Sequence, residues 1–286
     1  TLTTSGTTIA EDAGSSLTLT ATISQVADED VTVSISTGGT ATEGTDYNTI
    51  SDITVSAGDL TGTASFTPTN DSVYEINETA IVSISSVSGA DATESGTQSK
   101  TLTITADGDA APTVTLASSA TSIAENAGSS LTLTATLSNA TNEDVTVGIS
   151  TSGTGTEGTD YSTISDITIS AGQTTGTVSF TPTDDNTYEG NETGIVAIST
   201  VSGGSATEDG TQSVTITITE NENAPTVTLA TSASSIAENA GSSLTLTATL
   251  SVATTADVTV AISTSGTGTE GTDYSTISDI TISAGS

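Results

Sequence analysis

One phrase recurs three times along the chain and sets the size of its folding unit. SIAENAGSSLTLTATL begins at Ser122 and again at Ser235, and a close variant, TIAEDAGSSLTLTATI, begins at Thr8. Successive copies lie about 114 residues apart, which is the length of a domain and far exceeds one coil of a solenoid. The chain is therefore predicted to be a string of similar domains, at residues 1–110, 111–223 and 224–286.

The third copy is shorter than the other two. It stops in the phrase SAGS at Ser286, at a point from which the second copy continues for nearly half a domain. The first copy begins within its opening strand, because Thr1 and Leu2 match Thr115 and Leu116. An incomplete sandwich exposes the inner faces of its sheets. We therefore expect the polypeptide to run on, or the missing strands to come from another chain.

Within each copy, apolar residues alternate with threonine, as in LTLTATL from Leu131. This period of two is typical of a strand with one buried and one solvated face. The second copy contains seven such segments, separated by turns rich in glycine, serine and asparagine: 114–116, 131–137, 145–149, 167–169, 178–180, 193–201 and 214–218. The predicted fold class is all-β, with tandem immunoglobulin-like antiparallel β-sandwiches of about seven strands each, arranged as beads on a string.

The ionisable residues exclude several classes of function. The chain has 35 acidic residues and a single cationic one, Lys100, and it contains no histidine and no cysteine. Catalytic triads, thiolate zinc sites and disulfides are therefore excluded. Contacts to nucleic acid need clustered cationic side chains, so we expect no nucleic-acid partner. No apolar run reaches the roughly 18 residues of a membrane span, so no membrane insertion is expected in this segment.

The predicted strand directions sort the acidic residues by end of the domain. In an antiparallel sandwich the AB, CD and EF loops and the end of strand G share one end, which we call the acidic pole. Nine acids fall there in the second copy and nine in the first: Glu125, Glu157, Asp160, Asp184, Asp185, Glu189, Glu192, Glu220 and Glu222, and Glu11, Asp12, Glu43, Asp46, Asp71, Glu75, Glu78, Asp107 and Asp109.

So many carboxylates on a few loops require a counterion. Two like charges about 4 Å apart repel by about 1 kcal/mol even in water, and a domain is stable by only about 5–15 kcal/mol. Calcium is the expected partner, because it takes six to eight hard oxygen ligands from loops, whereas softer metals favour histidine or cysteine. The alternative is an acidic surface that serves solubility alone, but that interpretation predicts charges spread over the whole domain.

These phrases together resemble the Calx-beta family, whose repeats occur in the calcium-binding domains of sodium–calcium exchangers, in integrin β4 and in large bacterial surface proteins. The matching segments are SIAEN (122–126), GTEGTDY (155–161), TPTDDNTYEGNE (181–192) and VTITIT followed by ENEN (214–223). The resemblance covers both complete copies and the truncated third.

The resemblance implies a calcium site formed by an acid after strand A, an acid in the CD loop, several in the EF loop and further acids after strand G. Carried over, the implied ligands are Glu125, Asp160, Asp184, Asp185, Thr187 through its carbonyl, Glu189, Glu192, Glu220 and Glu222 in the second copy, and Glu11, Asp46, Asp71, Glu75, Glu78, Asp107 and Asp109 in the first. Asn70 stands where the second copy has Asp184, so fewer or weaker ions are expected in the first copy.

The function predicted from these features is a calcium-stiffened spacer in a large secreted bacterial adhesin or fibre, located outside the cell or at its surface. Its partners would be neighbouring repeats of the same chain, with self-association into fibres also open. A filament or sheath subunit is the alternative, and a calcium sensor is a less favoured one. We expect no enzymatic activity, because paired carboxylates that cleave glycosides need aromatic platforms, and aromatic residues make up only 2% of the chain.

Overall fold

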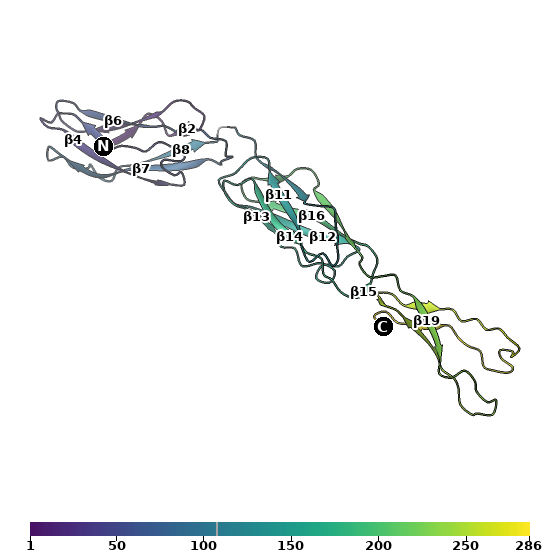
Figure 1. Cartoon of the computed structure of the whole chain (residues 1–286). Helices are drawn as coiled ribbons and strands as arrows, with labels where there is room; N and C mark the ends of the chain where they lie inside the picture. The colour runs from purple at the N-terminus through teal and green to yellow at the C-terminus, as the bar shows by residue number, and fades with distance from the viewer. Residues whose placement is uncertain (107) are drawn as a thin grey trace.

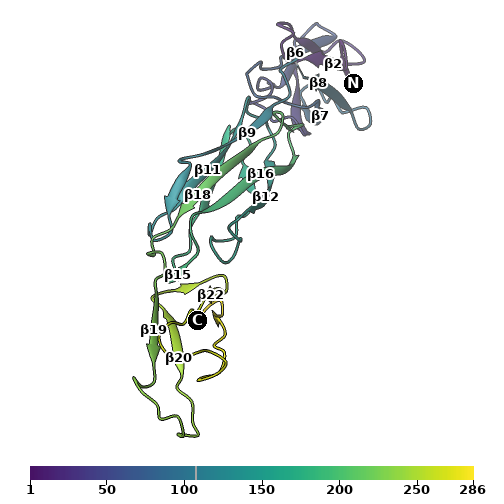
Figure 2. The same ribbon diagram turned by 90° about the vertical axis from the view of Figure 1, so that its right-hand side faces the viewer.

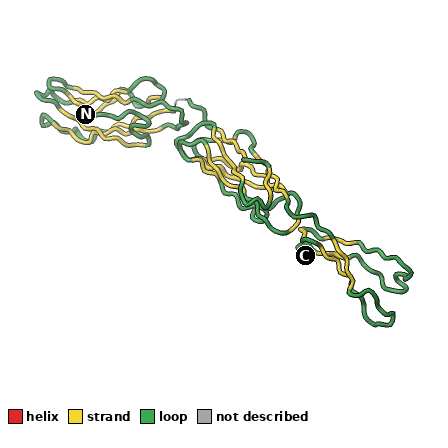
Figure 3. The backbone as a smooth tube through the Cα atoms, viewed as in Figure 1, coloured by secondary structure: helices red, strands yellow, loops and turns green. Residues whose placement is uncertain are grey.

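A computed structural model describes residues 1–106 and 108–286 of the chain. Three β-sheet bodies follow one another in chain order (Figure 1) and stay in a row in the perpendicular view (Figure 2). Strands and loops account for the described chain (Figure 3). In this described part, no helix is long and apolar enough to cross a membrane.

The second body, domain 2, is a sandwich of two sheets. Strands β10, β18, β16, β12 and β13 form one sheet, in that order, and β14, β11, β9 and β17 form the other. Their bounds are β9 Thr113–Ser118, β10 Ser122–Ala124, β11 Leu131–Leu137, β12 Val145–Gly153, β13 Ile167–Ile169, β14 Thr175–Phe180, β16 Glu192–Ser202, β17 Thr207–Glu208 and β18 Ser213–Thr219. All seven segments expected from alternation are strands, and the all-β sandwich prediction is confirmed.

Two short edge strands add parallel pairings to the otherwise antiparallel sheets of domain 2, because β10 pairs in parallel with β18 and β17 pairs in parallel with β9. Strand A is interrupted between Ser118 and Ser122, so that its first part, β9, joins one sheet and its second part, β10, joins the other. Strands β10 and β17, with the sequences SIA and TE, lack the alternation of apolar and polar residues by which a strand is recognised in a sequence.

Domain 1 has the same plan. Its first sheet runs β2-β8-β7-β4-β5 and its second β1-β3-β6. The bounds are β1 Leu2–Thr4, β2 Thr8–Ala10, β3 Leu17–Thr22, β4 Val31–Gly39, β5 Ile53–Val55, β6 Thr61–Phe66, β7 Glu78–Ser88 and β8 Ser99–Thr105.

The alternating apolar side chains meet between the two sheets of each sandwich. In domain 2, Leu133, Val147 and Ile216 are fully buried, and the rings of Tyr161 and Phe180 stack with centroids 4.7 Å apart. Each buried aliphatic or aromatic side chain contributes about 1.5–3 kcal/mol. Domain 2 thus has a self-contained core, which lies between Val114 and Ile218, and domain 1 has its own.

The third body is open. Strands β19 (Val227–Thr231) and β20 (Leu246–Leu250) form one hairpin, and β22 (Val258–Val260) and β23 (Ile280–Ile282) form another. Val227, Leu229 and Ile236 are exposed there. The remaining strand, β21 (Ala253–Thr254), pairs with β15 (Thr187–Tyr188) of domain 2.

Candidate metal centres

Parallel pairing brings the acids after strand A and strand G together in domain 2. Because β10 and β18 run side by side in the same direction, they end at the same pole. Glu125 follows β10 and Glu220 follows β18, and the Glu125 amide donates a hydrogen bond to the Thr219 carbonyl at 3.0 Å. The acidic pole of domain 2 thus contains both strand ends as well as the CD and EF loops.

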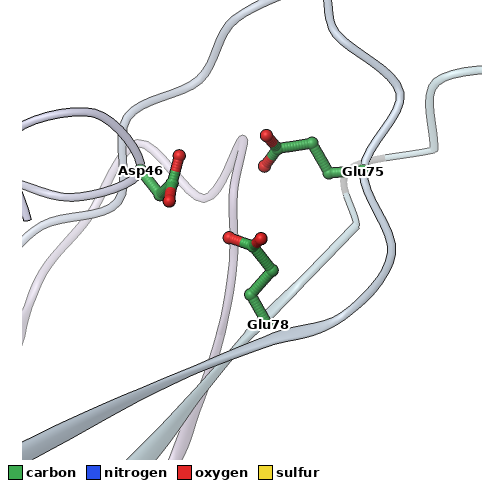
Figure 4. Close-up of side chains that lie close together, drawn as sticks. All are labelled: Asp46, Glu75 and Glu78. Atoms are coloured by element: carbon green, nitrogen blue, oxygen red, sulfur yellow. The ribbon is translucent and has the colours of Figure 1, made fainter. Parts of the chain in front are cut away.

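Three acids of the CD and EF loops converge in each complete domain, and we call each group a CD/EF cluster. In domain 2 it comprises Asp160, Glu189 and Glu192, with one carboxylate oxygen from each lying within 4.8 Å of the others. In domain 1 the equivalent residues Asp46, Glu75 and Glu78 meet the same condition. Their carboxyl groups point toward one another (Figure 4). This distance suits a shared cation, which would contact all three groups at once.

Domain 2 has a second group, the AB/G cluster, made of Glu125, Glu220 and Glu222 within the same 4.8 Å limit. The residues of domain 1 at the positions of Glu220 and Glu222 are Ala106 and Gly108. The equivalence follows from the hydrogen bonds of the preceding loops, because Asn77 accepts from the Ala106 amide as Asn191 accepts from the Glu220 amide. Two of the three carboxylates of an AB/G cluster are therefore absent from domain 1.

Short-range hydrogen bonds hold the CD-loop aspartate in place. Asp160 Oδ2 accepts a hydrogen bond from the Thr156 amide at 2.6 Å, and Asp46 Oδ2 accepts from the Thr42 amide at 2.5 Å. The neighbouring glutamate has both oxygens occupied, since Glu157 accepts from the Thr151 hydroxyl and from the Ile164 amide. Glu157, although it lies at the acidic pole, braces the loop and is not part of the cluster.

A glycine at the end of β12, just before the CD loop, allows this strand to approach its neighbour β16 closely. Gly153 ends β12 with a φ of +123°, and a Cβ there would lie 2.0 Å from the Thr193 carbonyl oxygen. Only glycine adopts this backbone conformation without strain and leaves room for that contact. The close approach places the CD loop next to the strand that carries Glu192.

Glu220 links the two clusters of domain 2 through backbone amides. Its Oε2 accepts hydrogen bonds from the Glu189 amide at 2.6 Å and from the Gly190 amide at 2.7 Å. Burial works against its ionisation, but these bonds and one from the Glu222 amide outweigh burial and lower its pKa. Glu220 is thus a fixed negative charge beside carboxyl groups that resist ionisation.

Several glutamates of the clusters have raised pKa values because burial and neighbouring charges disfavour their ionised form. Burial, together with the charge of Glu78, raises the pKa of Glu75 to about 8. Burial, with Asp160 and Glu189 nearby, raises that of Glu192 to about 7. Burial also raises the pKa of Glu125 to about 7, although the Asp185 amide works against the shift. A bound cation would reverse this electrostatic penalty.

Two buried carboxylate oxygens suit the role of a metal ligand. In the described part of the chain, Glu78 Oε2 and Glu222 Oε2 are buried and have no hydrogen-bond partner. An unpaired buried charge is costly unless it is paired or coordinates a metal. One such oxygen belongs to the CD/EF cluster of domain 1 and the other to the AB/G cluster of domain 2, so the residues present suit a hard cation.

Other predicted ligands take structural positions at the acidic pole. Glu11 and Glu125 are buried, and each accepts a hydrogen bond from the amide of an EF-loop aspartate, Asp71 or Asp185. Those aspartates in turn accept from the Val73 and Thr187 amides. Glu125 also belongs to the AB/G cluster.

The remaining predicted ligands lie at the edges of the pole. Asp184 is exposed, so the exchange to Asn70 in domain 1 changes less than the loss of the carboxylates at Ala106 and Gly108. Thr187 lies in β15, against the third domain. Asp109 is half-buried in the linker, and Asp107 lies outside the described residues.

The acidic pole also contacts the domain that follows it. The Tyr74 amide donates to the Ala140 carbonyl at 2.7 Å, and the Asn142 side chain donates to Glu78 Oε1 at 3.0 Å. At the next junction, Thr187 pairs with Ala253 and Tyr188 with Thr254. These contacts were not predictable from the sequence, because no local motif marks a residue that binds across a domain boundary.

The comparisons with known proteins follow the same repeat. The sequence profile of the Calx-beta domain matches residues 2–109, 107–222 and 220–281. Among curated protein sequences, none matches the chain.

Several solved structures are similar to the chain. The structure of CBD12 from CALX1.2 is 16% identical, with 74% of this chain and 96% of that chain covered and a TM-score of 0.33. Invasin, described as a bacterial integrin-binding protein, is 17% identical, with 98% of this chain and 53% of that chain covered and a TM-score of 0.35. The D0-D1 domain of intimin is 14% identical, covering 77% and 98%, with a TM-score of 0.25.

Proposed function

Since the chain belongs to the Calx-beta family, we propose that its acidic poles bind calcium and that its tandem domains form a stiff spacer in a large secreted bacterial surface adhesin or fibre. The observation that carries this proposal is the position of the clusters. Each complete domain gathers three acids within 4.8 Å at the pole that contacts the next domain.

The chemistry of the clusters favours calcium over other cations. All of the ligand atoms that the clusters offer are carboxylate oxygens, and the chain contains no histidine or cysteine for a softer metal. Calcium accepts irregular sets of six to eight oxygen ligands, whereas magnesium demands a near-ideal octahedron. When bound, calcium would supply the positive charge that the protein lacks. Asp46, Glu75 and Glu78 would hold it in domain 1, and Asp160, Glu189 and Glu192 in domain 2.

Stiffening follows from the place where these residues are attached. Glu75 and Glu78 flank the short stretch of EF loop that leads from Tyr74, and Tyr74 is hydrogen-bonded to domain 2. Without a cation, repulsion among the carboxylates works against an ordered EF loop. With a cation, the loop would be fixed to the CD loop of its own domain while Tyr74 and Glu78 remain attached to the next. The bending freedom of the junction should then fall.

A location outside the cell fits this chemistry. Extracellular calcium modules have dissociation constants of about 10⁻⁴–10⁻³ M. Calcium sites formed by loops can have affinities in this range. Tandem domains with their own cores and no cationic surface suit a spacer that separates other parts of a surface protein. The role proposed for this segment is mechanical and not catalytic.

Calorimetry and small-angle scattering test the proposal together. Calcium titrated into the chelator-treated chain should release or absorb heat, raise the melting temperature and narrow the distribution of molecular lengths. A chain carrying Asp46→Asn, Glu78→Gln, Asp160→Asn and Glu192→Gln, together with Glu125→Gln and Glu222→Gln in the AB/G cluster, should show none of these responses. The proposal fails if the unsubstituted chain shows no binding heat, no change in melting and no change in length.

A further inference from the structure

The two junctions of the chain use the same pair of backbone segments. At the first, Tyr74 of the EF loop donates its amide to Ala140 and accepts, at 3.4 Å, from the amide of Asn142. At the second, the EF strand β15 pairs in parallel with β21. Residues 140–142 and 253–255 occupy equivalent positions in their domains, in the loop between strands B and C. At both junctions, the EF segment of one domain therefore pairs with the BC loop of the domain that follows.

The BC loop has the same backbone arrangement in all three domains. The carbonyls of Ala27, Thr141 and Thr254 accept hydrogen bonds from the amides of Gly58, Gly172 and Gly285, at 2.9, 2.7 and 2.8 Å. Thr141 and Thr254, which lie at the two junctions, are buried, at 1% and 7% exposure. The BC loop of domain 1 has the same conformation as the two BC loops at the junctions, although no EF segment in the described chain pairs with it.

The unpaired groups of that loop are the ones that the junctions use. In the part of the chain that the structure describes, the Val26 carbonyl and the Asp28 amide have no hydrogen-bond partner. They occupy the positions of the Ala140 carbonyl and the Asn142 amide. Val26 is 57% exposed, and a cavity of about 740 Å³ opens beside it, lined in part by Gln25, Val26 and Ala27.

We propose that the BC loop of domain 1, residues 24–29, is a docking surface for the EF segment of a further Calx-beta repeat joined directly ahead of it. The pairing is a parallel backbone bridge in which the tyrosine of the EF segment donates to the Val26 carbonyl and accepts from the Asp28 amide. Backbone groups carry the recognition, so the bridge tolerates the exchange of Thr141 and Thr254 for Ala27 in domain 1.

The charge at this surface differs from that at the first junction. Asp28 stands where domain 2 has Asn142, and Asn142 contacts the carboxylate of Glu78. A docked EF segment would bring its own glutamate toward Asp28, so a cation or a proton favours the contact. The backbone bridge itself needs no metal, and the inference stands apart from the proposal that the clusters bind calcium.

The test extends the chain by one repeat and uses the absence of native cysteine. Residues 111–227, which include the complete core of domain 2, are joined directly to Thr1, because Val227 precedes Thr228 and Thr228 is equivalent to Thr1. Cysteines are placed at Tyr188 of the added repeat and at Ala27. A disulfide requires Cα atoms about 4.4–6.8 Å apart, so its yield reports the pairing.

Two other cysteine pairs calibrate the experiment. Tyr188→Cys with Thr254→Cys in the unextended chain reports the observed junction, and Tyr188→Cys in the added repeat with Ser16→Cys reports random encounter with an exposed loop at the far pole of domain 1. We expect the pair with Ala27 to cross-link to within about twofold of the observed junction, in calcium or in chelator. A yield no higher than the Ser16 control in both conditions would overturn the proposal, whatever calorimetry says of calcium binding.

Discussion

Carboxyl groups at the acidic pole differ in whether backbone amides already occupy their oxygen atoms. Glu157 and Glu220 accept hydrogen bonds from amides at 2.6–2.7 Å, and these bonds fix loops. Glu78 and Glu222 each keep a buried oxygen with no hydrogen-bond partner in the described chain. Residues of the second kind are the ones on which a cation should have its largest effect.

The pH dependence of stability should reveal these groups. Glu75, Glu125 and Glu192 have folded-state pKa values raised to between about 7 and 8, against about 4.3 for an unfolded glutamate. Their contribution is fully present below the unfolded value and is lost as pH rises through the folded one. In chelator, the melting temperature should therefore fall between about pH 5 and pH 8.

Calcium should flatten this profile, because it replaces the protons that the clusters would otherwise hold. In chelator, the variant Glu75→Gln, Glu125→Gln, Glu192→Gln should show a smaller fall, and the remaining fall comes from Glu78 and Glu189, whose pKa values burial also raises. Calorimetric scans across this pH range provide the measurement. A melting temperature in chelator that rises from pH 5 to pH 8 would contradict the account.

Cluster membership, and not acidity alone, should determine calcium affinity. Glu192→Gln removes one charged ligand, and a charge-assisted contact contributes about 1.5–3 kcal/mol, so calcium binding in domain 2 should weaken about 10- to 150-fold. Asp184→Asn removes an exposed acid of the same loop that belongs to no cluster, and affinity should change by less than about twofold. If titration calorimetry shows equal losses of calcium affinity in the two variants, the assignment of the ligands to the clusters is contradicted.

The sequence located the acidic pole but not its division into clusters. The alternating direction of successive strands predicted that Glu125, Asp160 and Glu192 lie at one end of domain 2, and they do. It could not predict that Glu157 and Glu220 are engaged by backbone amides, because such bonds depend on loop geometry. The resemblance to the family attributed the expected weaker ion binding of domain 1 to Asn70. The clusters in the structure attribute it instead to Ala106 and Gly108, which stand where domain 2 has glutamates.

At the scale of strands, the fold depends on close approaches that only glycine permits. Gly39 ends β4 of domain 1 with a φ of +110°, and a Cβ there would lie 2.1 Å from the Thr79 carbonyl oxygen. Gly39→Ala should destabilise domain 1 by about 1–3 kcal/mol, and each kcal/mol lowers the melting temperature of a domain this size by about 4–8 °C.

The adjacent glycine is a matched control for this prediction. A Cβ on Gly38 meets nothing within 4 Å, and its φ is not positive. Gly38→Ala should therefore leave the melting temperature of domain 1 nearly unchanged. If both substitutions lower it equally in calorimetric scans, the close approach at Gly39 is not what stabilises this loop.

Segments with alternating apolar residues were predictable, including the three-residue β13, and segments without such alternation were not. The run of Leu131, Leu133 and Ala135 identifies β11 without ambiguity, and its partners are fixed by the sandwich. Strands β10, β15 and β17 contain three, two and two residues, and they form only because a neighbouring strand presents free backbone groups. Two of them pair in parallel within domain 2, and β15 pairs with another domain.

At the scale of the whole chain, the acidic pole of one domain meets the BC loop of the next. The bodies lie in a row (Figure 1), and the CD/EF and AB/G clusters of carboxylates lie at the poles where the domains join. The first junction adds a side-chain contact, from Asn142 to Glu78, whereas the second has Thr255 at the position of Asn142. The two junctions should therefore respond differently to charge.

Asn142→Asp should loosen the first junction in the absence of calcium. The substitution replaces a hydrogen-bond donor to Glu78 with a like charge, so the distance between dyes on domains 1 and 2 should become more broadly distributed in chelator. Calcium should restore part of the order. Thr168→Asp adds the same charge on the exposed face of edge strand β13 and should leave the distribution unchanged; an equal broadening in both variants would exclude a specific role for Asn142.

A crystal structure of the chain grown in calcium tests the central claim most directly. The account predicts one cation bound by Asp46, Glu75 and Glu78, and a second bound by Asp160, Glu189 and Glu192, each with oxygen ligands at about 2.3–2.6 Å. It also predicts a cation at Glu125, Glu220 and Glu222 in domain 2 alone. Clusters that hold only water or shared protons at millimolar calcium would contradict it.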